Sequence, residues 1–173
     1  MEQKKLRARF RWEVVRISAT PVQIREAVAV ELPHDPKAVW HFLEDPRSSI
    51  ALSDRVSHAE RLTGTPLGLG QVQLFIHHTN TGRAGSMLEV VAYEPGRRAV
   101  TRTLTSPGGG GELVVEPLAA GCRVTQTHWM TLPVGTSSRV AKLTRRVLRE
   151  HLDDFAQRLA NLDSSVIGQW APA

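Results

Sequence analysis

The side chains best suited to acid–base chemistry are two histidines near the C-terminal end of the sequence. His128 follows Cys122, Val124 and Gln126 at alternate positions of a β-rich segment, and His151 lies in the segment that closes the chain. Alternate residues of a strand share one face, and the apolar Cys122 and Val124 favour that face as the buried one. A neutral imidazole can orient a carbonyl group or act as a general base. We therefore expect Gln126, His128 and His151 to line a site for a carbonyl-rich ligand.

Other residues extend this candidate site. Arg102 could polarise a carbonyl, so the candidate catalytic residues are His128, His151 and Arg102. The strand pattern does not determine which way Arg102 and His78 face, whereas it favours an outward position for Glu89. The remaining candidate ligand contacts are Met130, Thr144, Val147, His78 and Trp40.

The spacing of histidines and cysteine argues against metal or nucleophile chemistry. His77 and His78 are adjacent on a predicted strand and point to opposite faces, so they cannot share a metal. Cys122 and His128 are separated by about 20 Å along a strand, too far for one coordination shell or for a nucleophile–base pair. The sequence contains no HExxH, CxxC or GxSxG motif and no phosphate-binding P-loop. We predict that the protein uses neither a metal nor a cofactor.

The excess of positive charge is confined to one end of the chain. The formal net charge is +5, and residues 1–25 account for all of it with seven basic and two acidic side chains. Residues 26–173 hold 15 of each. A charged terminus is typically a solvated tail, although it could also contact an acidic partner. No nucleic-acid-binding signature accompanies these charges, so we expect no nucleic-acid partner.

Length and composition are typical of one domain. The chain has 173 residues and a single cysteine, Cys122, which excludes an intramolecular disulfide. Its first residues lack the apolar stretch of a secretory signal, and no segment approaches the roughly 18 apolar residues of a membrane helix. We expect a cytoplasmic monomer or homodimer without a membrane partner. The predicted parts are a basic arm (1–25), one domain (26–165) and a tail (166–173).

Turn signals divide the chain into short elements. Val28–Leu32 has the composition of a strand, Asp35 can cap a helix that Pro46 ends, and Ser48–Leu52 could add a further turn. Gly108–Gly111 is expected to form a flexible hairpin loop that could border a cavity mouth. Short connections make neighbouring strands antiparallel. The further predicted strands are 56–62, 71–79, 86–93, 98–105, 112–116 and 123–131.

The last predicted element is an amphipathic helix over about 137–162, capped by one of its first two serines. At 100° per residue its apolar side chains fill an arc of about 180°, and most of its basic residues lie on the opposite side. Thr144, His151 and Arg158 form a polar row within the apolar arc. Each could be satisfied locally, by a helix carbonyl, a strand carbonyl and solvent respectively. Because buried polar groups otherwise need partners or a wet cavity, we expect at least one of them to face a pocket.

Three stretches carry a resemblance to a known family. They are the helix entry VAVELPHDPKAVWHFLEDP and the hairpins VVAYEPGRRAVTR and GGELVVEPLAAGCRVTQTHW, and the closing helix completes the pattern. Together they resemble the polyketide cyclase/dehydrase-like branch of the START/Bet v 1 (SRPBCC) superfamily over about Val28–Leu162. The resemblance implies an α+β helix-grip fold. In this fold a curved antiparallel sheet wraps around a long C-terminal helix and encloses a ligand cavity.

The resemblance leaves three functions open. The first is the binding of a small hydrophobic or aromatic polyketide-like metabolite in secondary metabolism, with Gln126, His128 and His151 orienting it. The second is a polyketide cyclase, aromatase or dehydratase that uses His128 or His151 as acid or base. The third is self-resistance of an antibiotic producer by sequestering the metabolite. Tyr93 is the only tyrosine and no carboxylate–histidine pair emerges, which disfavours the enzyme.

Overall fold

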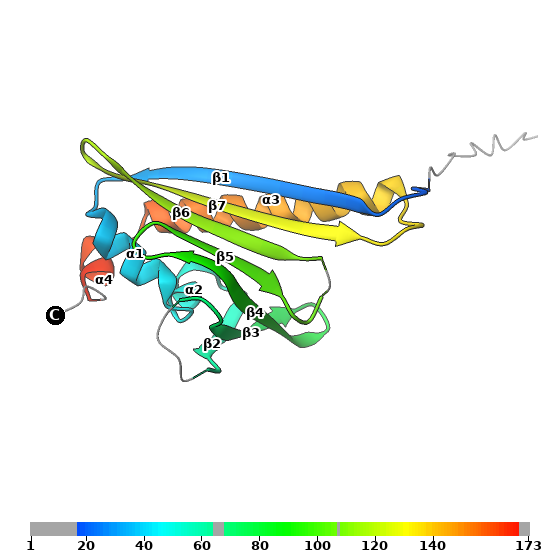
Figure 1. Cartoon of the computed structure of the whole chain (residues 1–173), viewed down its shortest axis with the longest axis horizontal. Helices are drawn as coiled ribbons and strands as arrows, with labels where there is room; N and C mark the ends of the chain where they lie inside the picture. The colour runs from blue at the N-terminus through cyan, green and yellow to red at the C-terminus, as the bar shows by residue number, and fades with distance from the viewer. Residues whose placement is uncertain (1–16, 64–67, 107, 170–173) are drawn as a thin grey trace, which may run out of the picture.

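The computed structural model describes residues 17–63, 68–106 and 108–169. Most of the predicted basic arm, residues 1–16, lies outside the described residues, as do positions 170–173 of the predicted tail. Within the described part, one sheet and one long helix provide the frame of the structure (Figure 1).

Seven antiparallel strands form one curved sheet (Figure 1). Their spatial order is β1-β7-β6-β5-β4-β3-β2, so the first strand pairs with the last and the others follow in reverse chain order. Tight turns impose this pairing, as at Gly96 between β4 and β5, where a φ of +75° suits glycine. The strands are β1 (Val22–Leu32), β2 (Val56–Arg61), β3 (Val72–Thr79), β4 (Gly82–Glu94), β5 (Arg98–Thr103), β6 (Gly110–Leu118) and β7 (Gly121–Leu132).

Four helices accompany the sheet in the described part of the chain: α1 (Pro36–Glu44), α2 (Ser48–Leu52), α3 (Ser138–Ala160) and α4 (Ser164–Gly168). The predicted caps are confirmed, since the Asp35 carboxylate accepts a hydrogen bond from the Lys37 amide and the Ser137 hydroxyl accepts one from the Val140 amide. α3 lies along β1 and β7 on one side of the sheet (Figure 1). The expected helix-grip arrangement is therefore confirmed. None of the helices in the described ranges is long and apolar enough to cross a membrane.

Several strands are longer than predicted, because pairing with a neighbour extends a strand beyond the segment with strong β propensity. β1 begins at Val22 instead of Val28, since its first residues pair with the end of β7. β4 begins at Gly82 instead of Ser86, since it pairs with β3 as far as a two-residue turn. The part of the predicted arm from Val22 to Arg25 is therefore a strand.

The glycine stretch is also different from the expectation. Gly110 and Gly111 belong to β6 and pair with β5 and β7, so the flexible loop predicted for Gly108–Gly111 is wrong over its second half. A Cβ added at Gly110 would lie 2.4 Å from the Thr101 carbonyl oxygen and 2.6 Å from Trp129 Cζ2. Only a residue without a side chain permits this close packing.

The two halves of α3 differ in burial. Leu152 and Leu159 in the C-terminal half are 1% and 0% exposed, and Leu159 belongs to the main core with residues of α1, α4, β6 and β7. In the N-terminal half Val140, Leu143 and Val147 are 48%, 49% and 44% exposed. This half extends along β1 and β7 beyond the ends of the other strands (Figure 1). The prediction that the whole apolar arc is buried is therefore wrong for the first turns of the helix.

Two arginines of α3 contact the sheet instead of lying free in solvent. Arg145 and Arg149 reach Glu26 of β1, with nitrogen–oxygen distances of 3.1 and 3.3 Å. The Glu26 side chain is only 12% exposed. These ion pairs connect the less buried half of the helix to β1.

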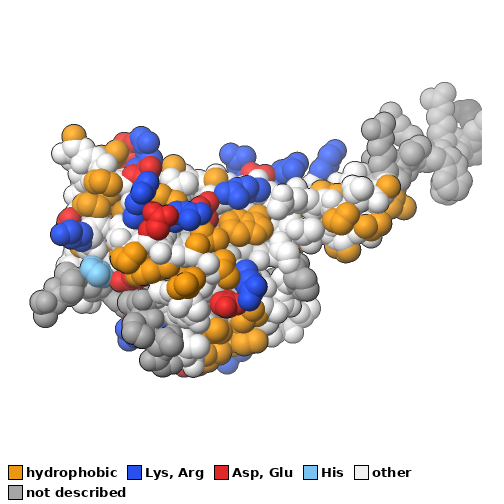
Figure 2. Space-filling model, in the orientation of Figure 1, with side chains coloured by type: hydrophobic (Ala, Val, Ile, Leu, Met, Phe, Trp, Pro, Cys, Tyr) orange, Lys and Arg blue, Asp and Glu red, His pale blue; other side chains and the backbone are white. Residues whose placement is uncertain are grey.

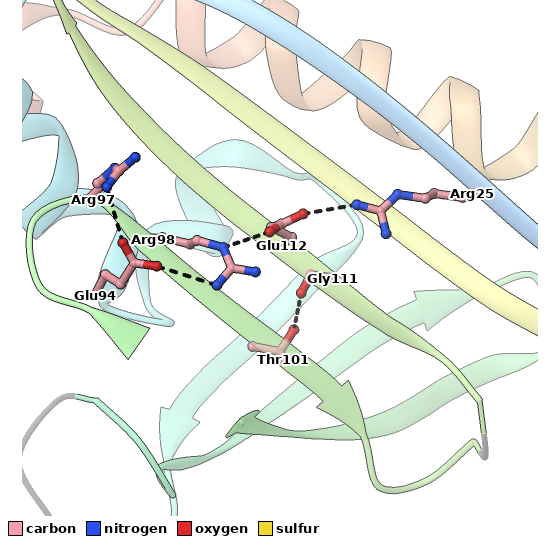
Figure 3. A network of polar contacts seen from close by, with 7 residues as sticks. All are labelled: Arg25, Glu94, Arg97, Arg98, Thr101, Gly111 and Glu112. Carbon is pink, nitrogen blue, oxygen red and sulfur yellow. Dashed lines mark hydrogen bonds and ion pairs between the residues drawn. The ribbon is translucent and has the colours of Figure 1, made fainter. Parts of the chain in front are cut away.

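A chain of ion pairs crosses the outer face of the sheet (Figure 3). Glu112 of β6 accepts from Arg98 of β5 at 2.8 Å and from Arg25 of β1 at 2.9 Å, and Glu94 pairs with Arg97 and Arg98. Figure 2 shows basic and acidic side chains interspersed over this view of the molecule. Exposed ion pairs each contribute little to stability, about 0–1 kcal/mol, so their main effect is to balance charge on this surface.

Replacing Leu159 with alanine should lower the free energy of unfolding by about 2–5 kcal/mol, because it removes a fully buried side chain from the core. Leu143→Ala removes the same atoms from a half-exposed position and should cost less than about 1 kcal/mol. Chemical denaturation of both variants measures the difference. Equal losses would mean that the N-terminal half of α3 is covered in solution.

Candidate ligand-binding cavity

A cavity of about 460 Å³ lies between the sheet and the three helices α1, α2 and α3. This volume is within the range of pockets that hold small organic ligands. Polar and apolar side chains both line it, and the apolar ones include Leu43, Leu52, Val56, Phe75, Leu88, Val90, Ala99, Leu113, Met130, Leu148 and Phe155.

The strand register places five residues of the cavity wall in one row across the sheet. Val90 is hydrogen-bonded to Gln71 and is paired with Thr101. Thr101 is paired with Gly111, and Gly111 with His128. Residues that are directly paired in antiparallel strands have side chains on the same face. All five line the cavity, so one row runs from the start of β3 to β7.

Gly111 keeps the middle of this row open. A Cβ at this position would lie 3.1 Å from His128 Cδ2 and 3.4 Å from Thr101 Oγ1. The Thr101 hydroxyl donates to the Gly111 carbonyl oxygen at 3.4 Å (Figure 3). The middle of the row therefore contributes space and a hydroxyl that already has a partner.

Two histidines from opposite walls meet in the cavity. The rings of His128 on β7 and His151 on α3 are stacked, with centroids 5.4 Å apart and an interplanar angle of 23°. Gln126 lies on the same face of β7, and its Nε2 is 3.0 Å from His128 Nε2. Because an amide nitrogen only donates, His128 Nε2 is the acceptor and its ring proton is on Nδ1.

Both imidazoles are kept neutral by their surroundings. Burial, and secondarily the nearby His151, lower the pKa of His128 to about 4. Burial also lowers the pKa of His151, with further contributions from His77 and Arg55, while Asp154 opposes the change. Desolvation disfavours the charged form of an imidazole, so both rings are uncharged at neutral pH.

A second histidine site lies on β3. His77 Nε2 is 2.9 Å from the Ser86 hydroxyl of β4, and burial lowers the pKa of His77. Gln73, on the same face of β3, is 9% exposed and also lines the cavity. The cavity therefore carries uncharged polar groups on both of its long walls.

Glu44, the last residue of α1, contributes a carboxylate to the cavity wall. Its Oε2 accepts from Trp40 Nε1 at 2.8 Å and from the Tyr93 hydroxyl at 2.7 Å, and its Oε1 is 2.7 Å from His41 Nδ1. Burial and the bond to Glu44 raise the pKa of Tyr93 to about 12. These contacts occupy the carboxylate, so it joins α1 to β4 instead of offering a free charge to a ligand.

Gln71 has the one buried side-chain atom without a hydrogen-bond partner within the described ranges. Its Oε1 accepts from the Gly68 amide at 3.3 Å, whereas its Nε2 has no partner there. The residue is 1% exposed and lines the cavity. A buried donor left unpaired costs about 1–3 kcal/mol.

The structure brings four of the predicted site residues together and separates the others. Gln126, His128, Met130 and His151 line the cavity. Thr144 does not, because its hydroxyl donates to the Val140 carbonyl at 3.0 Å, one of the alternatives open from the sequence.

Four further candidates lie away from the cavity. Val147 is on the exposed half of α3, and Trp40 is 1% exposed in the core, where it holds Glu44. His78 is exposed, because the strand alternation points its neighbour His77 inward. Arg102 pairs with Glu89 at 2.6 Å on the outer face, so Glu89 is outward as expected.

The sequence reasoning missed the inward face of β3, which carries Gln73, Phe75 and His77, and the inward-facing Gln71 just before this strand. The opposite face, from Val72 to Ile76, is the more apolar one and yet only partly buried. Buried polar side chains need hydrogen-bond partners, so a polar face that is more buried than its apolar counterpart indicates a cavity lined by polar groups. The sequence shows the alternation of polar and apolar residues but not which face is buried, so this segment could not be told from an ordinary half-exposed strand.

No group of three or more histidine, cysteine or acidic side chains suited to holding a metal occurs among the described residues.

Lowering the pH should destabilise the protein through His128. Its pKa is lower when folded (about 4) than the ordinary value of 6.5, so the unfolded chain binds more protons between these values. The stabilisation is present above about pH 6.5 and is lost as the pH falls toward 4, by about 3 kcal/mol. Urea unfolding across this range should show a steeper loss for the wild type than for His128→Gln. Parallel curves for the two proteins would contradict a neutral, desolvated His128.

The comparisons with known proteins agree with this geometry. Residues 21–160 match the family described as "Polyketide cyclase / dehydrase and lipid transport". A comparison with curated proteins gives no match.

Solved structures with the same fold include two di-domain ARO/CYC proteins and Ara h 8.0201. StfQ from the steffimycin biosynthetic pathway is 14% identical with a TM-score of 0.65, over 87% of this chain and 53% of StfQ. BexL from the BE-7585A biosynthetic pathway is 18% identical with a TM-score of 0.62, over 82% of this chain and 51% of BexL. Ara h 8.0201 is 9% identical with a TM-score of 0.57, over 81% of this chain and 100% of that protein.

The chain spans about half the length of the two di-domain proteins, and identities this low show the fold alone. Family membership is shown by the sequence match, which covers most of the chain and every strand of the sheet. The protein belongs to the polyketide cyclase/dehydrase and lipid transport family.

Proposed function

We propose that this protein binds a small, uncharged, hydrophobic or aromatic ligand of the polyketide type in its cavity. The observation that carries this proposal is the combination of an apolar wall with polar groups that are neutral at physiological pH. Imidazoles, amides and hydroxyls can orient the oxygens of such a ligand without the desolvation cost of a buried charge.

The charged groups around the cavity support an uncharged ligand. Glu44 and Glu112 are the charged residues of its described wall, and both are engaged, Glu44 by Trp40 and Tyr93 and Glu112 by arginines of the outer face. No lysine or arginine is among the described lining residues. A buried carboxylate or phosphate of an anionic lipid would therefore lack a cationic partner, which would be costly.

The similarity to ARO/CYC proteins supports the polyketide-like class and a role in secondary metabolism. Those two proteins come from biosynthetic pathways, and their domains share this fold.

Filling the cavity should abolish binding. Val90 is 4% exposed and lies in the middle of the wall, so Val90→Trp should weaken the binding of anthraquinone at least about tenfold by occluding the site. Val91→Trp places the same side chain on the outer face of the same strand and should leave affinity unchanged. Calorimetric titration with anthraquinone measures both variants. Saturable binding that survives Val90→Trp would place the ligand elsewhere.

A cyclase or dehydratase is a second candidate, favoured by the position of His151. Besides facing His128, His151 borders a smaller hollow of about 250 Å³ lined by Asp54, Arg55, Glu150, Asp154 and Arg158. This polar hollow would let His151 exchange protons with water while it faces the ligand. His128, with a pKa of about 4, is a weak base, and it suits the role of a neutral hydrogen-bond donor from Nδ1.

If the protein is an enzyme, His151→Ala should lower the turnover of a poly-β-ketone substrate by about 10²–10⁴-fold and change its affinity by less than about tenfold. His128→Ala should likewise lose turnover, since the carbonyl-polarising donor is removed. His78→Ala, an exposed histidine one residue away from His77, is the matched control and should retain full rate. Single-turnover rates and equilibrium titrations separate the two quantities. Equal losses of rate and affinity would assign both histidines to ligand placement alone.

A further inference from the structure

The row of paired residues across the cavity wall ends in a nitrogen donor on each side. At the β7 end, His128 carries its proton on Nδ1, since Nε2 accepts from Gln126. At the β3 end, Gln71 has a buried Nε2 without a partner in the described part of the chain, because its Oε1 is occupied by the Gly68 amide. If the Gln71 amide were flipped, its NH₂ group would face the Gly68 N–H, and two donors cannot bond. The bond from Gly68 therefore fixes the orientation of the amide and leaves Nε2 as the atom without a partner.

We propose that Gln71 is a second polar anchor of the cavity, so that the ligand is a flat apolar molecule with an acceptor oxygen at each end. This inference rests on the proposed binding function. Gln71 is buried, lines the cavity and has Nε2 unpaired within the described part of the chain. A ligand carbonyl, phenol or ether oxygen would supply the missing partner.

The spacing between the two anchors suits an elongated ligand. Gln71 and His128 are separated by Val90, Thr101 and Gly111, which is four strand spacings, or about 19 Å along the curved sheet. The straight distance between the side-chain tips is shorter, because both project from the curved wall into the same cavity. Between them the wall offers an apolar side chain, a glycine and a hydroxyl bonded to the Gly111 carbonyl.

The identity of the anchoring groups restricts the ligand ends. Both anchors donate, so they match oxygen acceptors and disfavour an ammonium group, which has only donors. Neither anchor is charged, so a carboxylate end would gain less than it loses by leaving water. The ligand class that fits is a polyphenol or quinone with oxygens at opposite ends.

Two probes that differ in one terminal hydroxyl test this inference. Calorimetric titration at pH 6 would compare 2,6-dihydroxyanthraquinone with 2-hydroxyanthraquinone, whose central carbonyls are identical. Wild-type protein should bind the dihydroxy compound about tenfold more tightly, because the second hydroxyl pairs with a buried donor. In Gln71→Leu the preference should fall below about twofold, because the donor is gone and only one anchor remains.

Gln73→Leu is the matched control, because Gln73 lines the cavity two residues after Gln71 and points in the same direction. It should change the affinity for both probes by the same factor and keep the tenfold preference. A preference that persists in Gln71→Leu, or one lost equally in both variants, overturns the role of Gln71 and leaves the binding function standing. Failure of both probes to bind the wild type saturably overturns the proposed function, and this inference with it.

A measurement on the wild type covers the case in which Gln71→Leu fails to fold. The side-chain amide resonance of Gln71 should shift when 2,6-dihydroxyanthraquinone saturates the protein. An unchanged resonance at saturation would show that Nε2 is satisfied by trapped water only and would overturn the proposal.

Discussion

The hydrogen-bonded register from β3 to β7 is the constraint on which the site depends. Gln71 and His128 are far apart in the sequence, and they share one cavity because Val90, Thr101 and Gly111 are paired in turn between them. The β4–β5 ladder keeps the Val90–Thr101 pair, although a register shift follows between Val90 and Ala92. A shift of one residue in any of these ladders would turn one end of the row to the outer face. Gly110 helps to keep this register, since the carbonyl of Thr101 and the ring of Trp129 occupy the space of a side chain there.

The polar groups of the protein are sorted by charge. Ion pairs such as Arg98–Glu112 and Arg102–Glu89 lie on the outer face of the sheet, where solvent reduces the cost of holding charge. Where the inner face lines the cavity it has imidazoles, amides and hydroxyls instead, and the pKa of His128 shows the same preference for the neutral form. Glu26, on the same face but outside the cavity lining, is neutralised by Arg145 and Arg149 of α3. A cavity of this kind can recognise oxygens in an apolar molecule without paying to desolvate an ion.

Stability and binding come from different parts of the fold. The solid core is formed where α1, α4 and the C-terminal half of α3 meet β6 and β7, around Trp40, Phe42 and Leu159. The cavity lies beside this core, where β3, β4 and β5 form part of its wall. Glu44 connects the core and the cavity through its bonds to Trp40 and Tyr93. The open space therefore exists next to rigid packing, which holds the walls apart.

The sequence by itself determined the order and type of the elements and part of the site. Caps at Asp35 and Ser137, tight turns and alternating strand residues are local signals, and they determined the order of the elements. The resemblance to a known family then implied the helix-grip arrangement. The face of β7 could also be predicted, because Cys122 and Val124 mark it as buried and carry Gln126 and His128 with them.

Only the tertiary structure decided which side of the other strands faces the cavity. On β3 the polar face is the inner one, so Gln71 and His77 were missed and His78 was wrongly included. On α3 the apolar arc is continuous, yet Val147 is exposed because only β1 and β7 extend along that half of the helix. The physical reason is that a period of two or 3.6 residues defines faces within an element, whereas burial of a face depends on what packs against it.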